Sequence, residues 1–158
     1  MSVFSRHNLL IAVMALLGIT MVSCNNDNCS GNSNAIPLAA FYEGQSNVSV
    51  PSLTVYGIGA PNDSCIISET SATQVYLPLR LEVTSCQYVL DYNVEGIEND
   101  TISLKYDAVP YFESHECGAM YNFNITSFAY TKNIIDSIAI PNSKITNADV
   151  VSIKIYMQ

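Results

Sequence analysis

The sequence predicts an all-β domain, an antiparallel β-sandwich of about eight or nine strands with an immunoglobulin-like or jelly-roll-like arrangement. Runs of alternating apolar and polar residues recur about every 8 to 12 residues between turn signals. Tyrosine, isoleucine, valine, threonine and serine are plentiful, lysine is sparse and tryptophan is absent. No sustained helical period follows residue 24. A closed, lipocalin-like barrel would give a similar pattern and is the alternative.

The first half of the domain contains four predicted strands. Ala35 to Tyr42 is the first, Ser52 to Gly57 the second, and the short run Cys65 to Ser68 the third. The fourth is Gln74 to Val83, in which five apolar residues share one face: Val75, Leu77, Leu79, Leu81 and Val83. Pro78 cannot donate a ladder hydrogen bond, so we expect an edge or a bulge there.

The second half contains five more predicted strands: Cys86 to Val94, Thr101 to Tyr106, Met120 to Tyr130, Ile134 to Ile140 and Val150 to Met157. The first of these places four residues on one face: Cys86, Tyr88, Leu90 and Tyr92. The next directs three residues inward: Ile102, Leu104 and Tyr106. We expect residues 107–116 to be irregular, because Pro110 lies within them. The acidic turn 95–100 is expected to be solvated.

The residues before the domain predict export. Residues 9–21 form an apolar run of 13 residues, which is shorter than the roughly 20 needed to cross a membrane and fits a signal peptide. Residues 21–24, Met-Val-Ser-Cys, resemble the lipobox of bacterial lipoproteins, whose cysteine is lipid-modified and becomes the new amino terminus. We therefore predict a signal peptide over 1–23, a polar tether over 24–34 that begins with acylated Cys24, and the sandwich over 35–158.

The charge of the mature chain excludes some partners. Without Arg6 it has five lysine and arginine residues against 14 acids, a net charge of −9. Because phosphate neutralisation dominates nucleic-acid affinity, we expect no nucleic-acid partner. The same balance argues against attraction to anionic lipid headgroups. Membrane contact is therefore expected through palmitate-type acyl chains on Cys24.

Four cysteines remain once Cys24 is acylated, and an oxidising periplasm favours disulfides between them. Of the three possible pairings, we predict Cys65–Cys86 and Cys29–Cys117. The first bond would close a loop of about 20 residues between neighbouring predicted strands, and the second would attach the tether to the domain. Free thiols are the alternative. A metal site is not expected, because the CxxC and HxxxH spacings of zinc sites do not occur.

The sequence gives little support for catalysis, and we expect no cofactor. His115 precedes Cys117 by two residues, but a nucleophilic pair would require a reactive thiolate, and we expect Cys117 to be oxidised. The GxSxG motif is absent. Glu95, Glu98 and Asp100 cluster, as do residues 113 and 116, but two carboxylates serve glycoside hydrolysis only when they flank one bond.

Two other features suggest recognition and modification. Tyr76 and Tyr156 lie on predicted outward faces, where tyrosine is favoured at recognition surfaces; cross-strand packing is the alternative. The sequences at 100–102 and 136–138, Asp-Thr-Ile and Asp-Ser-Ile, resemble the acceptor motif of O-glycosylation in Bacteroidetes. Thr101 and Ser137 are therefore candidate glycan sites.

Several short motifs together resemble a family of small uncharacterised lipoproteins typical of Bacteroidetes. They are Cys24 followed by Cys29, a short strand ending in Phe-Tyr at residue 42, Leu-Pro-Leu at 77–79, and Cys-Gly at 117–118 before an aromatic strand. The resemblance implies that Cys29 and Cys117 are the family's pair, with Cys65 and Cys86 as an additional pair. It implies a location and a fold but no activity.

The sequence as a whole predicts a non-enzymatic, lipid-anchored module for binding or envelope assembly, with a protein or glycan partner. We expect it at the outer membrane, on the periplasmic side rather than the cell surface, because Asp27 is the lone acid near Cys24. A small periplasmic hydrolase is one alternative and predicts a concave pocket with His115 or two close carboxylates. A lipocalin-like carrier is the other and predicts an apolar cavity inside a closed barrel.

Overall fold

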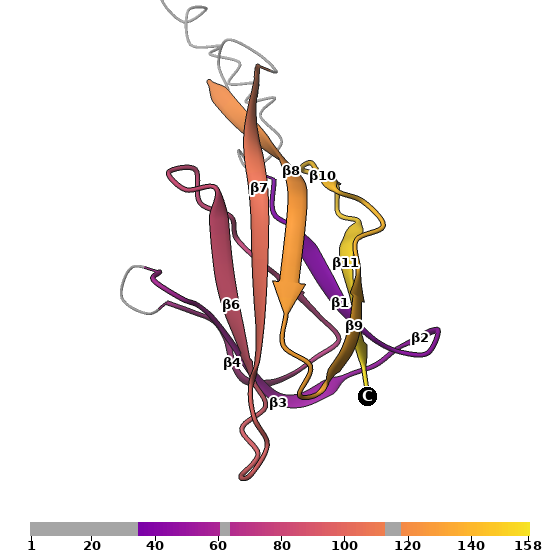
Figure 1. The fold of residues 1–158 in the computed structure, drawn as a ribbon. Coiled ribbons are helices and arrows are strands. Elements are labelled where there is room, and N and C mark those ends of the chain that lie inside the picture. The colour runs from indigo at the N-terminus through magenta and orange to yellow at the C-terminus, as the bar shows by residue number, and fades with distance from the viewer. Residues whose placement is uncertain (1–34, 61–63, 113–117) are drawn as a thin grey trace, which may run out of the picture.

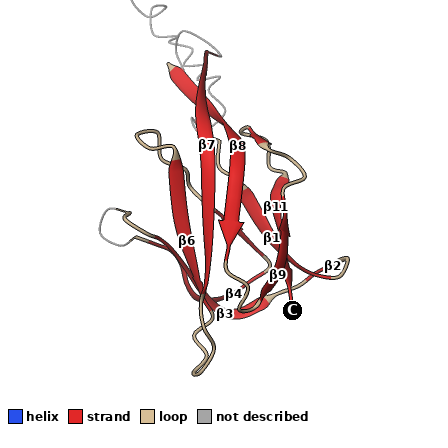
Figure 2. Ribbon diagram, viewed as in Figure 1, coloured by secondary structure: helices blue, strands red, loops and turns tan. Residues whose placement is uncertain are grey.

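Two β-sheets face each other in the computed structural model, which describes residues 35–60, 64–112 and 118–158. Figures 1 and 2 show the two layers, built from strands and loops. Within the described ranges the strands form two open sheets, so the predicted all-β sandwich is confirmed and the closed barrel is not the arrangement found. A helix long and apolar enough to span a bilayer is not found in this part of the chain.

The larger sheet has six strands, and every neighbouring pair in it is antiparallel. In spatial order they are β10 (Lys144–Ile145), β8 (Ala119–Tyr130), β7 (Asp100–Phe112), β6 (Ser85–Asp91), β3 (Val50–Gly57) and β4 (Cys65–Ala72). Strands β7 and β8 form its longest ribbon (Figure 1).

The smaller sheet contains both the first and the last strand of the domain. Its strands are β2 (Ser46–Asn47), β1 (Leu38–Glu43), β11 (Val151–Met157) and β9 (Ile135–Ala139) in spatial order, and β5 (Gln74–Tyr76) also pairs with β1. The first and last long strands, β1 and β11, run parallel, from Leu38 opposite Val151 to Tyr42 opposite Tyr156. Parallel neighbours require a long connection, and here the whole domain provides it.

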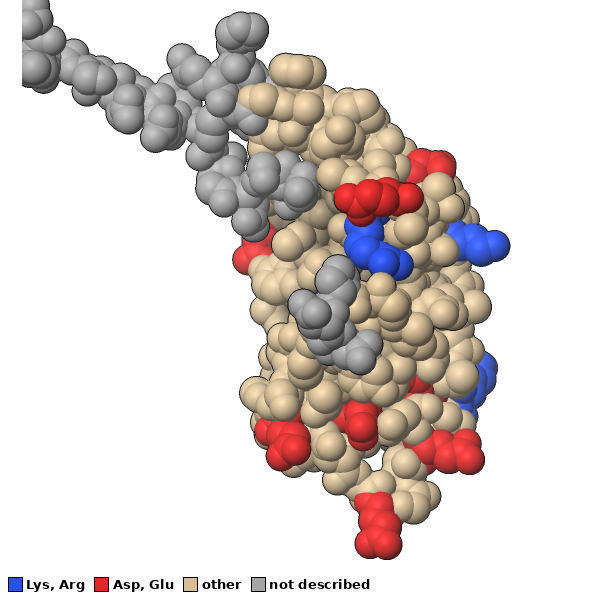
Figure 3. Space-filling view, turned by 90° about the vertical axis from the view of Figure 1, so that its left-hand side faces the viewer, with Lys and Arg blue, Asp and Glu red and all other residues tan. Residues whose placement is uncertain are grey.

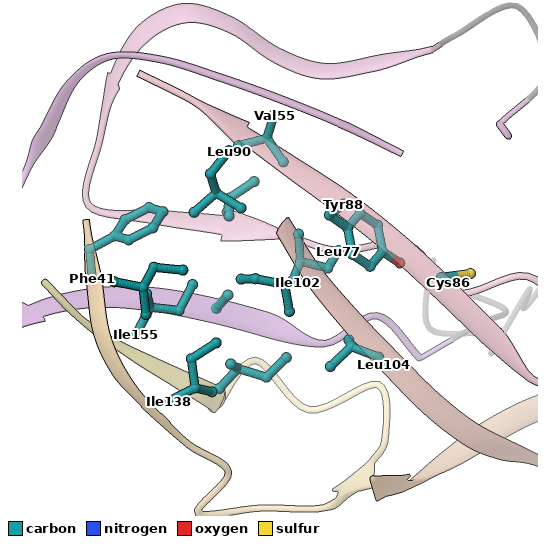
Figure 4. Close-up of a cluster of buried hydrophobic side chains, with 14 of the residues drawn as sticks. Phe41, Val55, Leu77, Cys86, Tyr88, Leu90, Ile102, Leu104, Ile138 and Ile155 are labelled. Carbon is teal, nitrogen blue, oxygen red and sulfur yellow. The ribbon is translucent and has the colours of Figure 1, made fainter. Parts of the chain in front are cut away.

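The predicted inward faces form the core between the sheets (Figure 4). All four residues predicted on one face of the 86–94 run are buried, three of them in β6 and Tyr92 directly after it, and the three inward residues of β7 are almost completely buried. They face Phe41 of β1 and Ile155 of β11, which are also fully buried. Each such side chain contributes about 1.5–3 kcal/mol on burial, which is why these strands hold the two sheets together.

The strand predicted over 74–83 is only partly correct. It ends at Tyr76, and the chain then crosses from the smaller to the larger sheet without strand pairing. Leu77 is still fully buried and donates its N–H to the carbonyl of Pro37, whereas Leu81 is exposed. Residues 77–80 are not part of a strand and residues 81–82 form a turn, so the apolar alternation over 77–83 does not correspond to a strand, and Pro78 lies at the point where pairing stops.

The prediction that residues 107–116 are irregular is wrong for the part that the structure describes, because β7 continues to Phe112. Strand β6 pairs β7 only as far as Lys105. Beyond Tyr106, whose N–H donates to the Thr84 carbonyl, no strand of the described residues pairs this edge of β7, so Pro110 can occupy it while β7 still pairs β8 on the other side. The register between β7 and β8 shifts after Lys105, where Thr126 is an extra residue, and this bulge explains the imperfect alternation in β8.

The sandwich has two distinct ends. We call the end that contains the 92–99 turn and Asp100 the pocket end, for the cavity described below. At the opposite end the described chain begins, and Ala35 donates its N–H to the carbonyl of Tyr121. Tyr121 lies opposite Pro110, ten residues along β7 from Asp100, so the two ends are about 34 Å apart at about 3.4 Å per residue.

Candidate functional site

An apolar pocket of about 310 Å³ opens at the pocket end of the sandwich. This volume lies at the lower limit of the roughly 300–1,000 Å³ typical of ligand pockets. Segments distant in sequence form its walls: Glu43 at the end of β1, residues 48–51 before and within β3, residues 92–97 after β6, Ile134 just before β9, and Met157 of β11. The lining is mostly apolar, so the pocket is suited to burying an apolar group of a ligand rather than to catalysing a reaction.

The 92–97 wall is a turn held by its own polar groups. Asn93 has a positive φ of 52° and Gly96 one of 82°, and both residue types tolerate this conformation. The Asn93 amide donates to the Ser52 carbonyl at 2.7 Å and to the Thr54 hydroxyl at 2.9 Å, which fixes the turn to β3. The side chains of Val94 and Ile97 are left 56% and 42% exposed at the pocket mouth.

A buried carboxylate beneath the pocket fixes two more of its walls. Asp100, at the start of β7, is fully buried and accepts five hydrogen bonds. One carboxylate oxygen accepts from the Tyr92 hydroxyl and from the backbone N–H groups of Ile134 and Ile135, at 2.8–2.9 Å. Because Tyr92 and Ile134 also line the pocket, Asp100 holds the pocket in shape.

The second carboxylate oxygen of Asp100 accepts from the Thr131 hydroxyl at 2.6 Å and from the Asn133 N–H at 2.9 Å. Burial alone would raise the pKa of Asp100, but the hydrogen bonds from Thr131 and the 133–135 backbone outweigh it and hold the pKa below its usual value. Burial and the neighbouring carboxylate raise the pKa of Tyr92, so its hydroxyl stays protonated and remains a donor. Asp100 is therefore a buried carboxylate anion, and both of its oxygens accept hydrogen bonds from neighbouring donors.

This finding corrects the prediction of a solvated acidic turn. Glu95 and Glu98 are exposed, as predicted, but Asp100 turns inward and is saturated by donors. The predicted carboxylate cluster therefore divides into two surface acids and one buried acid. Among the described residues no group of three or more potential metal ligands comes together.

The pocket mouth has an acidic border. Glu43 lines the pocket, and Glu95 and Glu98 each adjoin one of its lining residues. Figure 3 shows acidic side chains gathered towards the lower end of the molecule, which is the pocket end in Figure 1. None of the lining residues is a lysine or arginine. Lys132 is near this end in the chain, but its ammonium lies over the Tyr130 ring, 5.8 Å from the ring centroid.

A second polar cluster lies where the 77–84 crossover passes β6 and β7. The Tyr106 hydroxyl donates to the Arg80 carbonyl at 2.8 Å and accepts from the Arg80 N–H at 3.0 Å. The Tyr88 hydroxyl donates to the Pro78 carbonyl at 2.6 Å. Burial, with Cys86 alongside, raises the pKa of Tyr106 to about 12. Two tyrosines thus supply the partners that an unpaired crossover would otherwise lack.

Cys86 joins this cluster beside a smaller pocket of about 160 Å³. Its side chain is 6% exposed, and Sγ lies 3.1 Å from the Tyr106 hydroxyl oxygen. Since the single Tyr106 proton is directed to Arg80, the thiol is the donor in this contact. Burial raises the pKa of Cys86, but the hydrogen bonds that Tyr106 and Arg80 donate to the sulfur in its thiolate form outweigh burial and lower the pKa. The geometry gives Cys86 a packing role.

The predicted disulfide between Cys65 and Cys86 is absent, and both thiols are free. Strand β3 lies between β4 and β6, so the cysteines are on strands two places apart. Two strand spacings amount to about 9.5 Å, beyond the roughly 7 Å that a disulfide can bridge between Cα atoms. Cys65 is also exposed, whereas Cys86 faces the core. The sequence-based error was to treat the two strands as neighbours.

The predicted outward tyrosines are found on the outer face of the smaller sheet. Tyr76 is exposed and its hydroxyl donates to Asp149 at 2.7 Å. Tyr156 packs against Tyr42 with ring centroids 5.8 Å apart, and the Lys154 ammonium lies 5.0 Å from the Tyr42 ring centroid. The contact of Tyr156 with Tyr42 is cross-strand packing, the alternative interpretation of outward tyrosines, whereas Tyr76 bonds to a residue just before β11.

The remaining predicted residues have different outcomes. Thr101 on β7 and Ser137 on β9 are both partly exposed, and O-glycosylation stays a prediction. Cys24, Cys29, Cys117 and the residues 113, 115 and 116 lie outside the described residues, so the acylation, the second disulfide and the His115 hypothesis also stay predictions.

Sequence reasoning missed the pocket itself. Its lining comes from segments whose proximity depends on the order of the strands, and two lining residues, Val94 and Ile97, lie in a turn that was read only for its charge. One signal was available: two large apolar side chains in a short acidic turn are unusual for a purely solvated loop.

Comparisons with known proteins give a family without an activity. A family model described as "Family of unknown function (DUF6452)" matches residues 52–157, from the third residue of β3 to the end of β11. The matched region includes nearly all of the larger sheet, strands β5, β9 and β11 of the smaller sheet, and half of the pocket lining, whereas β1 and β2 lie before it. No curated protein and no solved structure matches the chain.

Proposed function

Because the chain belongs to the family of unknown function DUF6452, we propose its role from its own sequence and geometry. It is a non-enzymatic, lipid-anchored module of the cell envelope that binds a protein partner through the pocket end of the sandwich. Its position is the periplasmic side of the outer membrane.

The anchor is supported by the sequence that ends at Cys24, with an apolar run of 13 residues before it. The ten residues 25–34 can reach at most about 33–36 Å when fully extended. Acyl chains on Cys24 would hold the amino-terminal end of the domain within that distance of the membrane. Two or more chains give stable anchoring.

The observation that carries the proposal is the placement of the pocket and the chain entry at opposite ends of the sandwich. Ala35 bonds to Tyr121 at one end, and Tyr92 and Ile97 line the pocket at the other. A domain anchored through its amino terminus would therefore present the pocket away from its own membrane. That is the favourable position for a partner that approaches from the periplasm.

The chemistry of the pocket favours binding over catalysis. Asp100, the carboxylate beneath the pocket, already accepts five hydrogen bonds and has no free acceptor for a substrate proton. The apolar lining gives its free energy by removing a partner's apolar surface from water. Both features support a recognition module.

Metabolic labelling with a palmitate analogue tests the anchor. We expect the full-length protein to carry the label and to sediment with membranes, and Cys24→Ala to lose both properties. Cys29→Ala is the matched control, since it removes a nearby cysteine and should leave the label in place. An unlabelled wild-type protein contradicts the anchor.

Site-specific photo-crosslinking in intact cells tests the binding end. A photoreactive amino acid is placed at Ile97, at the pocket mouth, and in a second strain at Val109, a residue of almost equal exposure near the other end of β7. We expect a discrete protein adduct from position 97 that is absent from position 109. Adducts from position 109 alone would refute the assignment of the pocket end.

A further inference from the structure

We propose that the pocket end recognises a cationic protein segment with an apolar centre. One apolar side chain of the partner enters the pocket, and lysine or arginine residues beside it face the carboxylates at the pocket mouth. This inference rests on the proposed function and specifies the chemistry of the partner.

The apolar half of the inference comes from the pocket mouth. Val94 and Ile97 are 56% and 42% exposed although both line a pocket whose floor is apolar. A volume of about 310 Å³ accommodates one large aromatic or aliphatic side chain with its neighbouring backbone. An aromatic anchor in a pocket is the usual energetic centre of a protein interface.

The cationic half comes from the border of the same pocket. Glu43 is an exposed residue of the lining, and Glu95 and Glu98 are exposed and directly follow the lining residues Val94 and Ile97 in the chain. A cation seated beside the apolar anchor is attracted by these carboxylates, and salt screens that attraction over a Debye length of about 8–10 Å. The Lys132 ammonium is held over Tyr130. An acidic or nucleic-acid partner would meet repulsion at this end.

The pocket is already organised for such a partner. The Tyr92 hydroxyl and the Ile134 N–H are fixed by Asp100, and the Asn93 amide fixes the 92–97 turn to β3. A preformed site loses little conformational entropy on binding. Because the walls are rigid, the binding affinity should depend on the shape of the apolar side chain that enters the pocket.

The fluorescence of a tryptophan-containing peptide tests the inference. The protein contributes no tryptophan emission of its own, because its chain contains no tryptophan. The probe is a capped pentapeptide with a central tryptophan and two lysines on each side, titrated with the full-length protein in a non-ionic detergent. We expect a shift of tryptophan emission to shorter wavelength as the ring enters the pocket. The same peptide with four glutamates should bind at least about tenfold more weakly, as should a lysine peptide with a central alanine.

Matched variants locate the binding. Ile97→Ser should weaken binding of the lysine–tryptophan peptide several-fold, whereas Val109→Ser, at a site of equal exposure, should not. The double variant Glu95→Gln with Glu98→Gln should weaken it at low salt and less at high salt. The control Glu69→Gln with Glu82→Gln changes two exposed acids outside the pocket lining and should have little effect.

Three results would overturn the inference: no emission shift, equal binding of the glutamate peptide, or equal effects of Ile97→Ser and Val109→Ser. A peptide that fails to bind, while position 97 still crosslinks to a protein in cells, means that the partner's chemistry is wrong and the proposed function stands. If the peptide does not bind and position 97 gives no crosslink to a protein, the proposed function is refuted as well.

Discussion

Replacing the buried carboxylate of Asp100 by an amide should unfold the pocket end far more easily than any surface change of the same charge. Asp100→Asn keeps the size of the side chain but converts one of two acceptor oxygens into an NH₂ donor. In one orientation this NH₂ meets the Asn133 N–H and the Thr131 hydroxyl, and in the other it meets Ile134 and Ile135.

The structure sets the size of the effect. The Thr131 hydroxyl can rotate and accept from the new NH₂, but the Asn133 N–H cannot, so at least one buried donor is left without a partner. Such a group costs about 1–3 kcal/mol, and the bonds that remain lose the charge assistance that makes them worth about 1.5–3 kcal/mol each. We expect a total loss of about 3–5 kcal/mol in the free energy of unfolding, with a fall in Tm of roughly 10–20 °C.

The pH dependence gives a second, independent expectation. Because the folded pKa of Asp100 is lowered, its stabilisation is fully present above the unfolded value of about 3.9 and is lost as pH falls through the folded pKa. Asp100→Asn cannot titrate. The difference in unfolding free energy between wild type and variant should therefore be largest near neutral pH and shrink below about pH 4.

Urea unfolding at several pH values is the assay, and Asp107→Asn is the control, because Asp107 is an exposed acid on the same strand. The control should change stability by less than about 0.5 kcal/mol. A loss below about 1 kcal/mol in Asp100→Asn, or a loss that does not shrink in acid, would refute the reasoning.

Three further predictions concern the thiols, the crossover and the core. An aromatic disulfide reagent should label Cys65 in the native protein at once and Cys86 only on unfolding, and a peptide map that links the two residues would contradict the structure. Tyr106→Phe should cost about 2–4 kcal/mol in urea unfolding, because it leaves two backbone groups of the crossover without partners; a change below about 0.5 kcal/mol would count against this role. Phe41→Ala should cost about 3–5 kcal/mol, whereas Phe112→Ala, at a residue 73% exposed, should be nearly neutral in a thermal melt; equal losses would contradict the assigned core.

The core was the part of the fold most open to sequence reasoning. Period-two alternation identifies the buried face of a strand wherever one face meets a core. Tyr88 and Leu90 on β6, with Ile102 and Leu104 on β7, were therefore assigned correctly. Alternation does not report pairing partners, so the parallel contact between β1 and β11 was not predicted.

The errors share a physical cause. Apolar alternation does not require strand pairing, and the 77–83 segment resembled a strand although its residues are unpaired and include a turn at 81–82. Pro110 suggested a break, but a proline on a free edge does not end a strand. Strand order decides both cases, and it depends on contacts between residues far apart in the sequence. The same is true of Cys65 and Cys86, which β3 separates.

The candidate site was less accessible still. A buried Asp100 is hidden in sequence by the exposed acids before it, and its donors at 133–135 lie more than 30 residues away. The pocket appears only when β3, the 92–97 turn, Ile134 before β9 and Met157 of β11 come together. Apolar Val94 and Ile97 were the local sign of it.

Amide chemical shifts of the labelled protein, recorded while the lysine–tryptophan pentapeptide is added, test the binding site most directly. The pocket-end assignment predicts saturable shifts confined to the amides that surround the pocket, at Val48, Val94, Ile97 and Ile134. The outer face around Tyr76, which is outside the pocket lining, should not change. Shifts centred on Tyr76 and its neighbours, with the pocket amides unmoved, would contradict the account.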